Sequence, residues 1–514
     1  MGYRYGDIFQ PRIKANFLLL LFILLCAGCL FFHIPIFNDA ATTTKWFWFF
    51  AFIFSSGCFL FLWRHKNNQF ALTTFDIILF LVWIYFLLLS VIDVRDINAV
   101  RFYLSLLILY CLFRLAIKTE YLKSIFFIIG ILCFLLALYG MAQFWGFFPT
   151  RGNVKILGNF DNPAGYASSL ALGLPFVLYF LFEKRKVFKY AAYFILGVII
   201  LSILLSASRA GIISTVCASL FFIFRTSKFY EKIKYKRLIY LFVAVILFIL
   251  FIGLYFVKKD SADGRVLIWN CTGKMITEKP FLGHGTGSFK AKYMLYQADY
   301  FKQNPDSSFA SLADNVMHPF NEFLLVWVEE GILGLSLLLL VVIATIKLFY
   351  KNSSRTFIAL QSSLIAIFIF SCFSYPMNYP FSWIILILCF TSLANLPEKA
   401  FLIGVTFKKL KLILCSVSIL SAFCFFPLMK QLKNEYQWCK IARKSFTGHA
   451  VEMIPEYDKL FPDMQRSPLF LYNYAAELNH IEEYKKSKEL ILLCEAKLND
   501  YDIQLLAANN YLQL

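Results

Sequence analysis

The sequence predicts an all-α polytopic membrane protein with about 12–13 transmembrane helices. Of its 514 residues, 60% are hydrophobic and only 16% are charged, whereas soluble domains contain about 45–50% and about 25%. Phenylalanine alone accounts for 60 residues. A water-soluble fold cannot cover that much apolar side chain, and disordered chains are poor in it. The composition therefore excludes a soluble enzyme and a disordered chain.

Thirteen apolar runs are predicted to span the membrane. A transmembrane helix needs about 20 mostly apolar residues. The runs are continuous rather than alternating, and backbone groups cannot stay unpaired in lipid, so helices are predicted and not barrel strands. The predicted spans are residues 17–36, 46–63, 75–92, 102–117, 124–145, 164–182, 188–206, 210–224, 238–257, 320–346, 356–374, 380–396 and 410–429.

The positive charges predict the orientation of these spans. If the N-terminus lies inside, the inside segments carry 25 Lys and Arg residues and the short outside loops carry 6. This asymmetry is the positive-inside pattern of membrane proteins. It accounts for most of the net charge of +19, so no nucleic-acid partner is needed. The long loop 258–318 and the tail 430–514 are then both outside.

Four parts follow from this topology. Residues 1–150 form N-terminal transmembrane helices, and residues 151–346 form a core that includes the loop 258–318. Residues 347–429 form C-terminal transmembrane helices, and residues 430–514 form the outside tail.

The tail is predicted to be helical. A first helix opens at Ser467, and a second covers about residues 481–498. The apolar face of the first helix consists of Leu471, Tyr474, Ala475 and Leu478. A shift of 34 residues, the tetratricopeptide (TPR) period, superposes two pairs of leucines, Leu471 on Leu505 and Leu478 on Leu512. Only one repeat and a fragment fit, so a plain helical hairpin remains the alternative to a TPR-like tail.

Two arginines lie in turns that suit an anion. Arg209 follows small residues in a tight outside turn, and its planar fork matches phosphate oxygens. Arg265 is expected in the first turn of a helix that Asp263 caps and Pro280 ends, where free N–H groups favour anions. One face of that helix is expected to consist of Val266, Trp269, Gly273 and Ile276. The alternatives are a snorkelling Arg209 at a helix end and a solvated Arg265 in a loop.

A glycine-rich turn follows at residues 281–289. Such a turn can form a phosphate nest. It does not follow a strand and lacks the Lys-Ser/Thr end of a P-loop, so nucleotide binding is not expected. His284 is interpreted as a turn residue.

The segment His318-Pro319-Phe320-Asn321-Glu322 marks re-entry into the membrane. Pro319 suits the first turn of a helix. If that helix runs on, His318, Glu322 and Glu329 share one face. A histidine beside a carboxylate is the usual general-base pair. The alternatives are an interfacial cap for His318 and structural ion pairs for Glu329 and Glu330.

A polar cluster, Asn159-Phe160-Asp161-Asn162-Pro163, precedes the sixth span. Its side chains can bind a sugar or cap the helix that follows, and the cap is the favoured interpretation.

These motifs occur in one order along the chain. An Arg after Ser-x-Ser is followed by Gly-Arg-x-x-x-Trp, the Pro280–Gly285 turn, and the His/Asn/Glu re-entry with Glu330-Gly331-Ile332-Leu333-Gly334. In this respect the sequence resembles the O-antigen ligase family, most specifically over about residues 150–340. That family includes lipopolysaccharide ligases, related polymerases and protein O-oligosaccharyltransferases. The resemblance implies a GT-C-like glycosyltransferase architecture in the bacterial inner membrane.

The resemblance also implies a chemistry in lipopolysaccharide biosynthesis. Such proteins transfer a glycan from an undecaprenyl diphosphate carrier to an acceptor hydroxyl on the periplasmic face, without a metal or cofactor. The acceptor would be lipid A-core or a protein hydroxyl. The resemblance implies binding of the diphosphate by Arg209 and Arg265, and a base at His318. Further contacts to the glycan or diphosphate would come from Asn162, Asn321 and Glu322.

One position departs from the family pattern. Family members often carry a histidine directly before the asparagine, and here that residue is Phe320, with His318 two residues earlier. Other acceptors would make the protein an O-antigen polymerase or a protein O-oligosaccharyltransferase. A transporter of lipid-linked glycan is the alternative from another class. It would bind near the midplane on broken helices, often within inverted repeats, and no such repeat is evident.

Overall fold

The computed structural model describes residues 6–37, 39–62, 69–92, 97–151, 154–227, 258–350, 352–396 and 403–514, with isolated positions between 245 and 256. Within these residues the chain is helical apart from one two-stranded antiparallel ribbon. The ribbon pairs β1 (Gln69–Leu72) with β2 (Ile403–Thr406).

Ten of the described helices are long and apolar enough to cross a membrane, and two shorter apolar helices accompany them. They coincide with twelve of the thirteen predicted spans, which confirms the predicted fold class. The remaining prediction, 238–257, lies outside the described residues. The helices are α1 (Gly6–Phe31), α2 (Thr43–Cys58), α3 (Thr74–Ile92), α4 (Ile97–Ala116), α5 (Leu122–Phe144), α6 (Pro163–Leu178), α7 (Lys186–Leu205), α8 (Arg209–Thr226), α13 (Glu322–Tyr350), α14 (Arg355–Phe373), α15 (Pro380–Ala394) and α16 (Phe407–Lys444).

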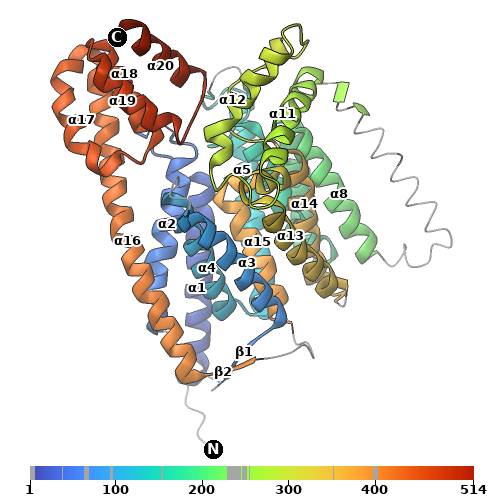
Figure 1. Cartoon of the computed structure of the whole chain (residues 1–514). Coiled ribbons are helices and arrows are strands. Elements are labelled where there is room, and N and C mark those ends of the chain that lie inside the picture. The colour runs from blue at the N-terminus through green and yellow to red at the C-terminus, as the bar shows by residue number, and fades with distance from the viewer. Residues whose placement is uncertain are drawn as a thin grey trace, which may run out of the picture.

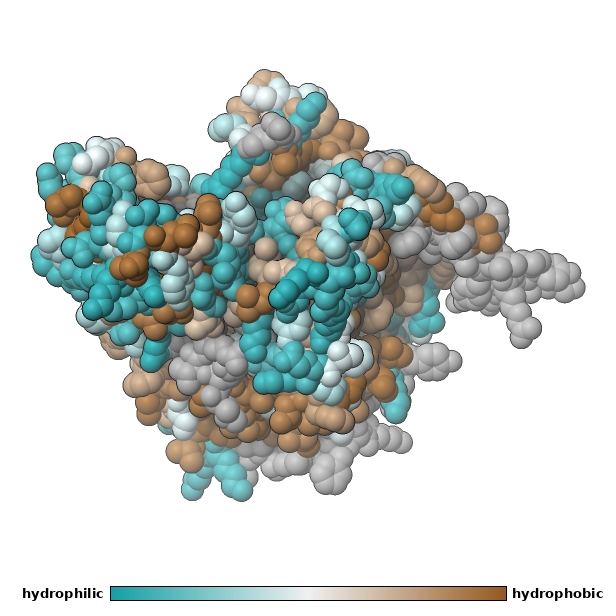
Figure 2. Space-filling model, turned by 45° about the horizontal axis from the view of Figure 1, so that its top comes forward, coloured by the Kyte–Doolittle hydropathy of each residue, from teal (hydrophilic) through white to brown (hydrophobic). Residues whose placement is uncertain are grey.

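The polar elements gather at one end of this bundle, and the β1–β2 ribbon lies at the other (Figure 1). We name the first of these the polar end. Figure 2 shows hydrophilic residues over the tail and hydrophobic residues over the bundle below it. The elements at the polar end are α11 (Lys259–Glu278), α12 (Ser288–Gln303), α17 (Ala450–Met464), α18 (Pro468–His480), α19 (Tyr484–Glu495) and α20 (Tyr501–Gln513). Short helical turns join the elements: η1 (Leu60–Leu62), η2 (Thr119–Tyr121), η3 (Tyr179–Phe182), η4 (Ala310–Leu312), η5 (Pro376–Asn378) and η6 (Ser445–His449).

Helix α6 lies at the centre of the main hydrophobic core, and most of its length is buried. Small residues allow its neighbours to approach closely. A Cβ atom at Gly165 would lie 2.4 Å from the Tyr379 ring, and one at Gly173 would lie 2.2 Å from Cys133 Sγ. This packing fixes the first turn of α6, and therefore Asn162 just before it, against the start of α15.

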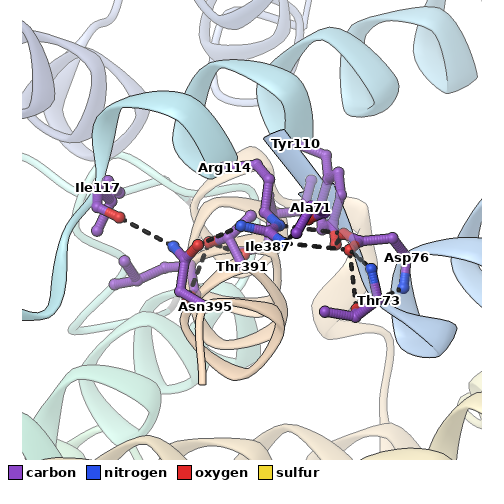
Figure 3. Close-up of polar contacts among 10 residues, drawn as sticks. Ala71, Thr73, Asp76, Tyr110, Arg114, Ile117, Ile387, Thr391 and Asn395 are labelled. Carbon is purple, nitrogen blue, oxygen red and sulfur yellow. Dashed lines mark hydrogen bonds and ion pairs between the residues drawn. The ribbon is translucent and has the colours of Figure 1, made fainter. Parts of the chain in front are cut away.

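A buried carboxylate holds the end of the bundle that faces the β ribbon (Figure 3). Asp76 on α3 accepts from Thr73 N at 2.7 Å, Thr73 Oγ1 at 2.8 Å, and the Tyr110 hydroxyl. Arg114 on α4 donates to it from Nε at 3.1 Å and Nη2 at 3.2 Å, and also donates to Ala71 O and Asn395 Oδ1. The charge is therefore paired and hydrogen-bonded, as a buried ion pair requires. It ties together α3, α4, α15 and β1.

The tail is helical, and both predicted helices are present as α18 and α19. The predicted face of Leu471, Tyr474, Ala475 and Leu478 is buried. Leu505 and Leu512, which the 34-residue shift pairs with two of these residues, are 55% and 84% exposed. The buried side of α20 consists of Ile503, Ala507 and Asn510 instead. The two pairs of leucines are therefore not equivalent in burial, and the TPR assignment stays a prediction.

Candidate functional site

A cluster of positive charges lies where α8 meets α11. Arg209 is the first residue of α8, after a turn in which Ala207 has φ of 51° and Ser208 caps the helix. Its guanidinium donates to Lys258 O at 3.1 Å and to Ser261 Oγ at 2.9 Å. Lys258 Nζ donates back to Ala207 O at 3.2 Å. These contacts hold Arg209 against the start of α11.

Arg265 lies one turn beyond Ser261 on α11, so both face the same side of that helix. Burial, and then the charge of Arg209, lower the pKa of Arg265 to about 10. Among the described residues, no carboxylate lies within ion-pair distance of Arg209, Lys258 or Arg265. The structure thus brings together the two predicted arginines and adds Lys258. Three cations without a counter-charge are suited to an anion.

The start of the helix around Arg265 differs from the prediction. It begins at Lys259, so Arg265 lies in its second turn, and Asp263 does not cap it but accepts from Tyr255 Oη at 2.8 Å. Val266 and Trp269, which the spacing places on one face of this helix, are 44% and 36% exposed. The buried side is Leu267, Ile268, Cys271, Thr272, Met275 and Ile276. The anion site therefore depends on side-chain charge and not on the free N–H groups of a first turn.

The membrane re-entry begins with a cap rather than a continuous helix. Asn321 Oδ1 accepts from Phe323 N at 2.9 Å and Leu324 N at 3.1 Å, and α13 begins at Glu322. Phe320 has φ of 54°, in the left-handed region. His318 is therefore not on the α13 helix, and the predicted common face with Glu322 and Glu329 is wrong. Glu322 Oε1 instead accepts from Met377 N at 2.9 Å, and Asn321 Nδ2 donates to Cys372 O at 3.1 Å.

His318 packs against an aromatic ring. Its imidazole stacks on Tyr375 with ring centroids 4.5 Å apart and an interplanar angle of 21°. Its Nδ1 is buried and has no hydrogen-bond partner among the described residues. Burial, and then the charge of Lys290, lower the pKa of His318 to about 3. The imidazole is therefore neutral near pH 7, which is the form that accepts a proton.

A row of aromatic rings joins Arg265 to His318. The Arg265 guanidinium lies 5.1 Å from the centroid of Phe320, and the Phe320 ring lies 5.3 Å from that of Tyr375, which stacks on His318. Phe320, which marks the departure from the family pattern, is thus the ring that contacts the arginine.

Asn162 joins the same cluster from α6. Its Oδ1 accepts from Gly165 N at 2.9 Å, which confirms the predicted helix cap. Its Nδ2 donates to Tyr375 Oη at 2.7 Å and to Tyr379 Oη at 2.8 Å. The amide therefore orients two tyrosines that the sequence analysis did not single out.

A cavity of about 1490 Å³ opens beside this cluster. The polar residues that line it near His318 are Tyr375, Glu322, Glu329, Glu330 and Lys290, together with His318 itself. Apolar side chains of α2, α3, α4, α13 and α14 line its depth, and the tail covers it with Gln465–Leu469 and Lys497. Arg209 and Arg265 are not among its lining residues. His318 and Tyr375 therefore lie between the cation cluster and the cavity.

The glycine-rich turn docks on a break in α13. Gly331 has φ of 71° and ψ of −174°, so the helix is interrupted there. His284 N donates to Val328 O at 2.8 Å, Gly285 N donates to Glu329 O at 2.9 Å, and Ile332 N donates to Pro280 O at 2.9 Å. The turn thus pairs the backbone groups that the break frees.

The two carboxylates beside this break contact the glycine-rich turn and the start of α12. Glu329 Oε1 accepts from Phe289 N at 3.3 Å in the first turn of α12, and Glu330 Oε1 accepts from Thr286 Oγ1 at 3.4 Å. His284 is buried, and its Nε2 lies 2.8 Å from Met275 O, as suits a residue within the docked turn. The break therefore presents both carboxylates to the cavity.

Comparison with protein families places a match in the middle of the chain. Residues 194–339 match the model of the O-antigen ligase family. The matched segment contains Arg209, Arg265, His318, Asn321 and Glu322, while Asn162, Tyr375 and the tail lie outside it. No curated protein matches the chain. The resemblance read from the sequence is thereby confirmed, and with it a glycan-transferring membrane enzyme of the ligase or polymerase type.

Proposed function

We propose that this chain, with its O-antigen ligase domain, transfers a glycan from a polyprenyl diphosphate carrier to an acceptor hydroxyl. The observation that carries the proposal is the separation of two neighbouring sites. The cation cluster suits the diphosphate of the donor, and the cavity on the other side of His318 and Tyr375 suits the acceptor. We further propose that the polar end of the bundle faces the periplasm of a bacterial inner membrane.

The donor side is argued from charge. A diphosphate placed between Arg209 and Arg265 relieves their mutual repulsion and receives charge-assisted hydrogen bonds, which are about twice as strong as neutral ones. Negative charge grows on the leaving diphosphate as the glycosidic C–O bond breaks. Fixed cations at that position stabilise the transition state more than the ground state. The chain's own residues thus provide this stabilisation.

The acceptor side is argued from His318. The acceptor oxygen attacks the anomeric carbon, the C–O bond to the phosphate breaks with its electron pair on the diphosphate, and the hydroxyl proton passes to His318. The imidazole has a buried nitrogen without a partner among the described residues, which is the atom that would accept that proton. Asn321 and Glu322 hold the segment that carries His318, through the helix cap and the bond to Met377 N. In this proposal they act on the substrate indirectly.

The shape of the cavity supports an acceptor that is itself a membrane lipid. Most of its lining within the bundle is apolar, apart from a few polar residues such as Arg225, Thr345 and Gln361, and many polar residues line it beneath the tail. Lipid A-core combines acyl chains with a hydroxyl-rich head in the same order. A protein hydroxyl would make no use of the apolar depth. We therefore propose lipid A-core as the acceptor, ahead of a protein.

The break in α13 does not favour the transporter alternative. A transporter uses the backbone groups of a broken helix to bind its cargo. Here the turn at residues 280–285 already occupies the groups freed at Gly331.

The test uses the purified chain in nanodiscs with labelled glycan on undecaprenyl diphosphate and lipopolysaccharide that lacks O-antigen. Glycan transfer is expected, and His318→Ala is expected to lower turnover while retaining affinity for the carrier, because a base acts mainly in the transition state. Transport of the carrier across liposomes without glycan transfer would contradict the proposal. Transfer to protein but not to the lipid would contradict the acceptor assignment alone.

A further inference from the structure

Tyr375 lies where the donor and acceptor sites of the proposed function meet. It sits between the end of α14 at Phe373 and the short turn η5. Two tryptophans fix η5, because Trp383 Nε1 donates to Met377 O at 2.8 Å and Trp46 Nε1 donates to Asn378 O at 3.1 Å. The position of Tyr375 is therefore set by the scaffold and not by a free loop.

The ring of Tyr375 contacts the residues of both sites. One neighbour is His318, stacked at 4.5 Å, and another is Phe320, edge-on at 5.3 Å. Aromatic contacts of this kind contribute beyond simple burial because they fix the relative orientation of the rings. Without the Tyr375 ring, the His318 imidazole would lose the surface that orients it toward the cavity.

The hydroxyl group of Tyr375 retains a donor. A phenol has one O–H donor and also accepts hydrogen bonds. Asn162 Nδ2 donates to it at 2.7 Å, and in the part of the chain that the structure describes no atom accepts its proton. Tyr379 offers a direct comparison, because it also receives a bond from Asn162 but donates its own proton to Asp161 Oδ1 at 2.8 Å. Of this pair, only Tyr375 has a proton to offer a ligand.

The surroundings identify the kind of ligand. Burial, and then the Asp161 carboxylate, raise the pKa of Tyr375, so the phenol stays protonated and remains a donor. Arg265 lies close enough to act on Tyr375 electrostatically, and Tyr375 also borders the cavity. A neutral O–H donor beside uncompensated cations suits an anionic oxygen, since a hydrogen bond to an ionised acceptor is stronger than one to a neutral acceptor.

We propose that Tyr375 is a further substrate-binding residue, which donates its hydroxyl proton in a hydrogen bond to the diphosphate of the donor while its ring orients His318. This inference rests on the proposed function for the identity of the ligand. No bond to the tyrosine forms or breaks, so its hydroxyl assists departure of the diphosphate without itself being consumed. Tyr375 thereby couples the two sites, since one side chain contacts the leaving group and the proton acceptor.

Three variants separate the two roles. Tyr375→Phe keeps the ring and removes the hydroxyl, whereas Tyr375→Leu removes both. Tyr379→Phe is the matched control, because that ring is only 1% exposed and its hydroxyl is already paired with Asp161. Each variant is measured in nanodiscs for binding of undecaprenyl diphosphate and for glycan transfer, after its thermal stability has been checked.

We expect Tyr375→Phe to bind undecaprenyl diphosphate several-fold more weakly and to transfer glycan about 100-fold more slowly, as for loss of a transition-state hydrogen-bond donor. Tyr375→Leu should be slower again, and Tyr379→Phe should stay within about threefold of wild type. If Tyr375→Phe binds and transfers like wild type while wild type is active, the inference is wrong and the proposed function stands. If undecaprenyl diphosphate binding depends on the hydroxyl but wild type transfers no glycan, the proposed function is wrong and the binding site stands.

Discussion

Replacing Gly331 by alanine is expected to undock the glycine-rich turn from α13. Gly331 has φ of 71° and ψ of −174°, a region essentially limited to glycine. An added Cβ would lie 2.1 Å from Phe281 O, a backbone atom that has no way to move aside without moving the turn. The strain costs about 1–3 kcal/mol. The four backbone bonds that link the turn to the break contribute about 1 kcal/mol each.

Together these effects amount to roughly 5–7 kcal/mol. At about 2.1 cal/mol/K per residue, a cooperative chain of this size loses roughly 1 °C of Tm per kcal/mol, so Tm should fall by about 5–7 °C. Hydrogen exchange offers a local measurement, because the amides of His284 and Gly285 donate across the break and should exchange faster in the variant. Gly273→Ala is the control, since a Cβ there meets no atom within 4 Å. If both variants show the same exchange over residues 280–290, the docked turn is wrong.

Three further predictions concern the arginines, His318 and the orientation. Arg209→Lys and Arg265→Lys should each lower the rate of glycan transfer about 10-fold or more, because the planar guanidinium matters at a diphosphate even when the charge is kept. The loss of rate in the double variant should be smaller than the product of the two single losses. Wild-type rates for both single variants would contradict the cation site. For His318, a pKa near 3 against an ordinary value of 6.5 means that no proton is gained between pH 8 and 5, so kcat/KM should show no acid limb from this residue. In the unfolded chain this histidine does bind a proton, so the free energy of unfolding should fall as pH drops below about 6.5, and His318→Asn should reduce that fall. A decrease of kcat/KM below about pH 6.5 that disappears in His318→Asn would refute this prediction. Reporter fusions after residues 230, 300 and 514 should read inside, outside and outside, and an inside reading for the last would remove one span from the predicted topology.

The spans were predictable because membrane insertion acts on local composition. An apolar run of sufficient length forms a helix in lipid whatever the rest of the chain does. Arg209 and Arg265 were predictable for a related reason. Each stands out within its own segment, either as a cation in a turn of small residues or in a motif of the family. The errors begin where a local pattern depends on a distant partner.

Residues 320–346 show this dependence. The run is apolar and reads as one helix, yet Gly331 breaks it because the turn around Phe281, about fifty residues earlier, occupies the gap. At its start, Pro319 suggested the first turn, whereas Asn321 provides the cap. Asparagine is a favoured N-cap residue, so that signal was present and was outweighed.

Tyr375 and Lys258 had no such signal. A tyrosine near the end of a membrane helix is ordinary, since aromatic residues gather at both interfaces. A lysine at the start of a polar loop is equally common. Their importance depends on contacts with Asn162, His318 and Arg209, which lie far away in the sequence. Only the folded arrangement brings these residues together.

The two ends of the bundle explain why burial alone does not identify a binding site. Asp76 is fully buried, but the five hydrogen bonds it accepts leave its charge no capacity for a ligand. At the polar end, Arg209 and Arg265 lie near each other without a carboxylate among the described residues, and the neighbouring Tyr375 hydroxyl still has a proton to donate. A satisfied cluster stabilises the fold, because removing any partner strands a buried charge. An unsatisfied cluster of like charges costs folding free energy, which an anionic ligand recovers on binding. The balance of charge, rather than the degree of burial, therefore separates the structural cluster at Asp76 from the candidate donor site.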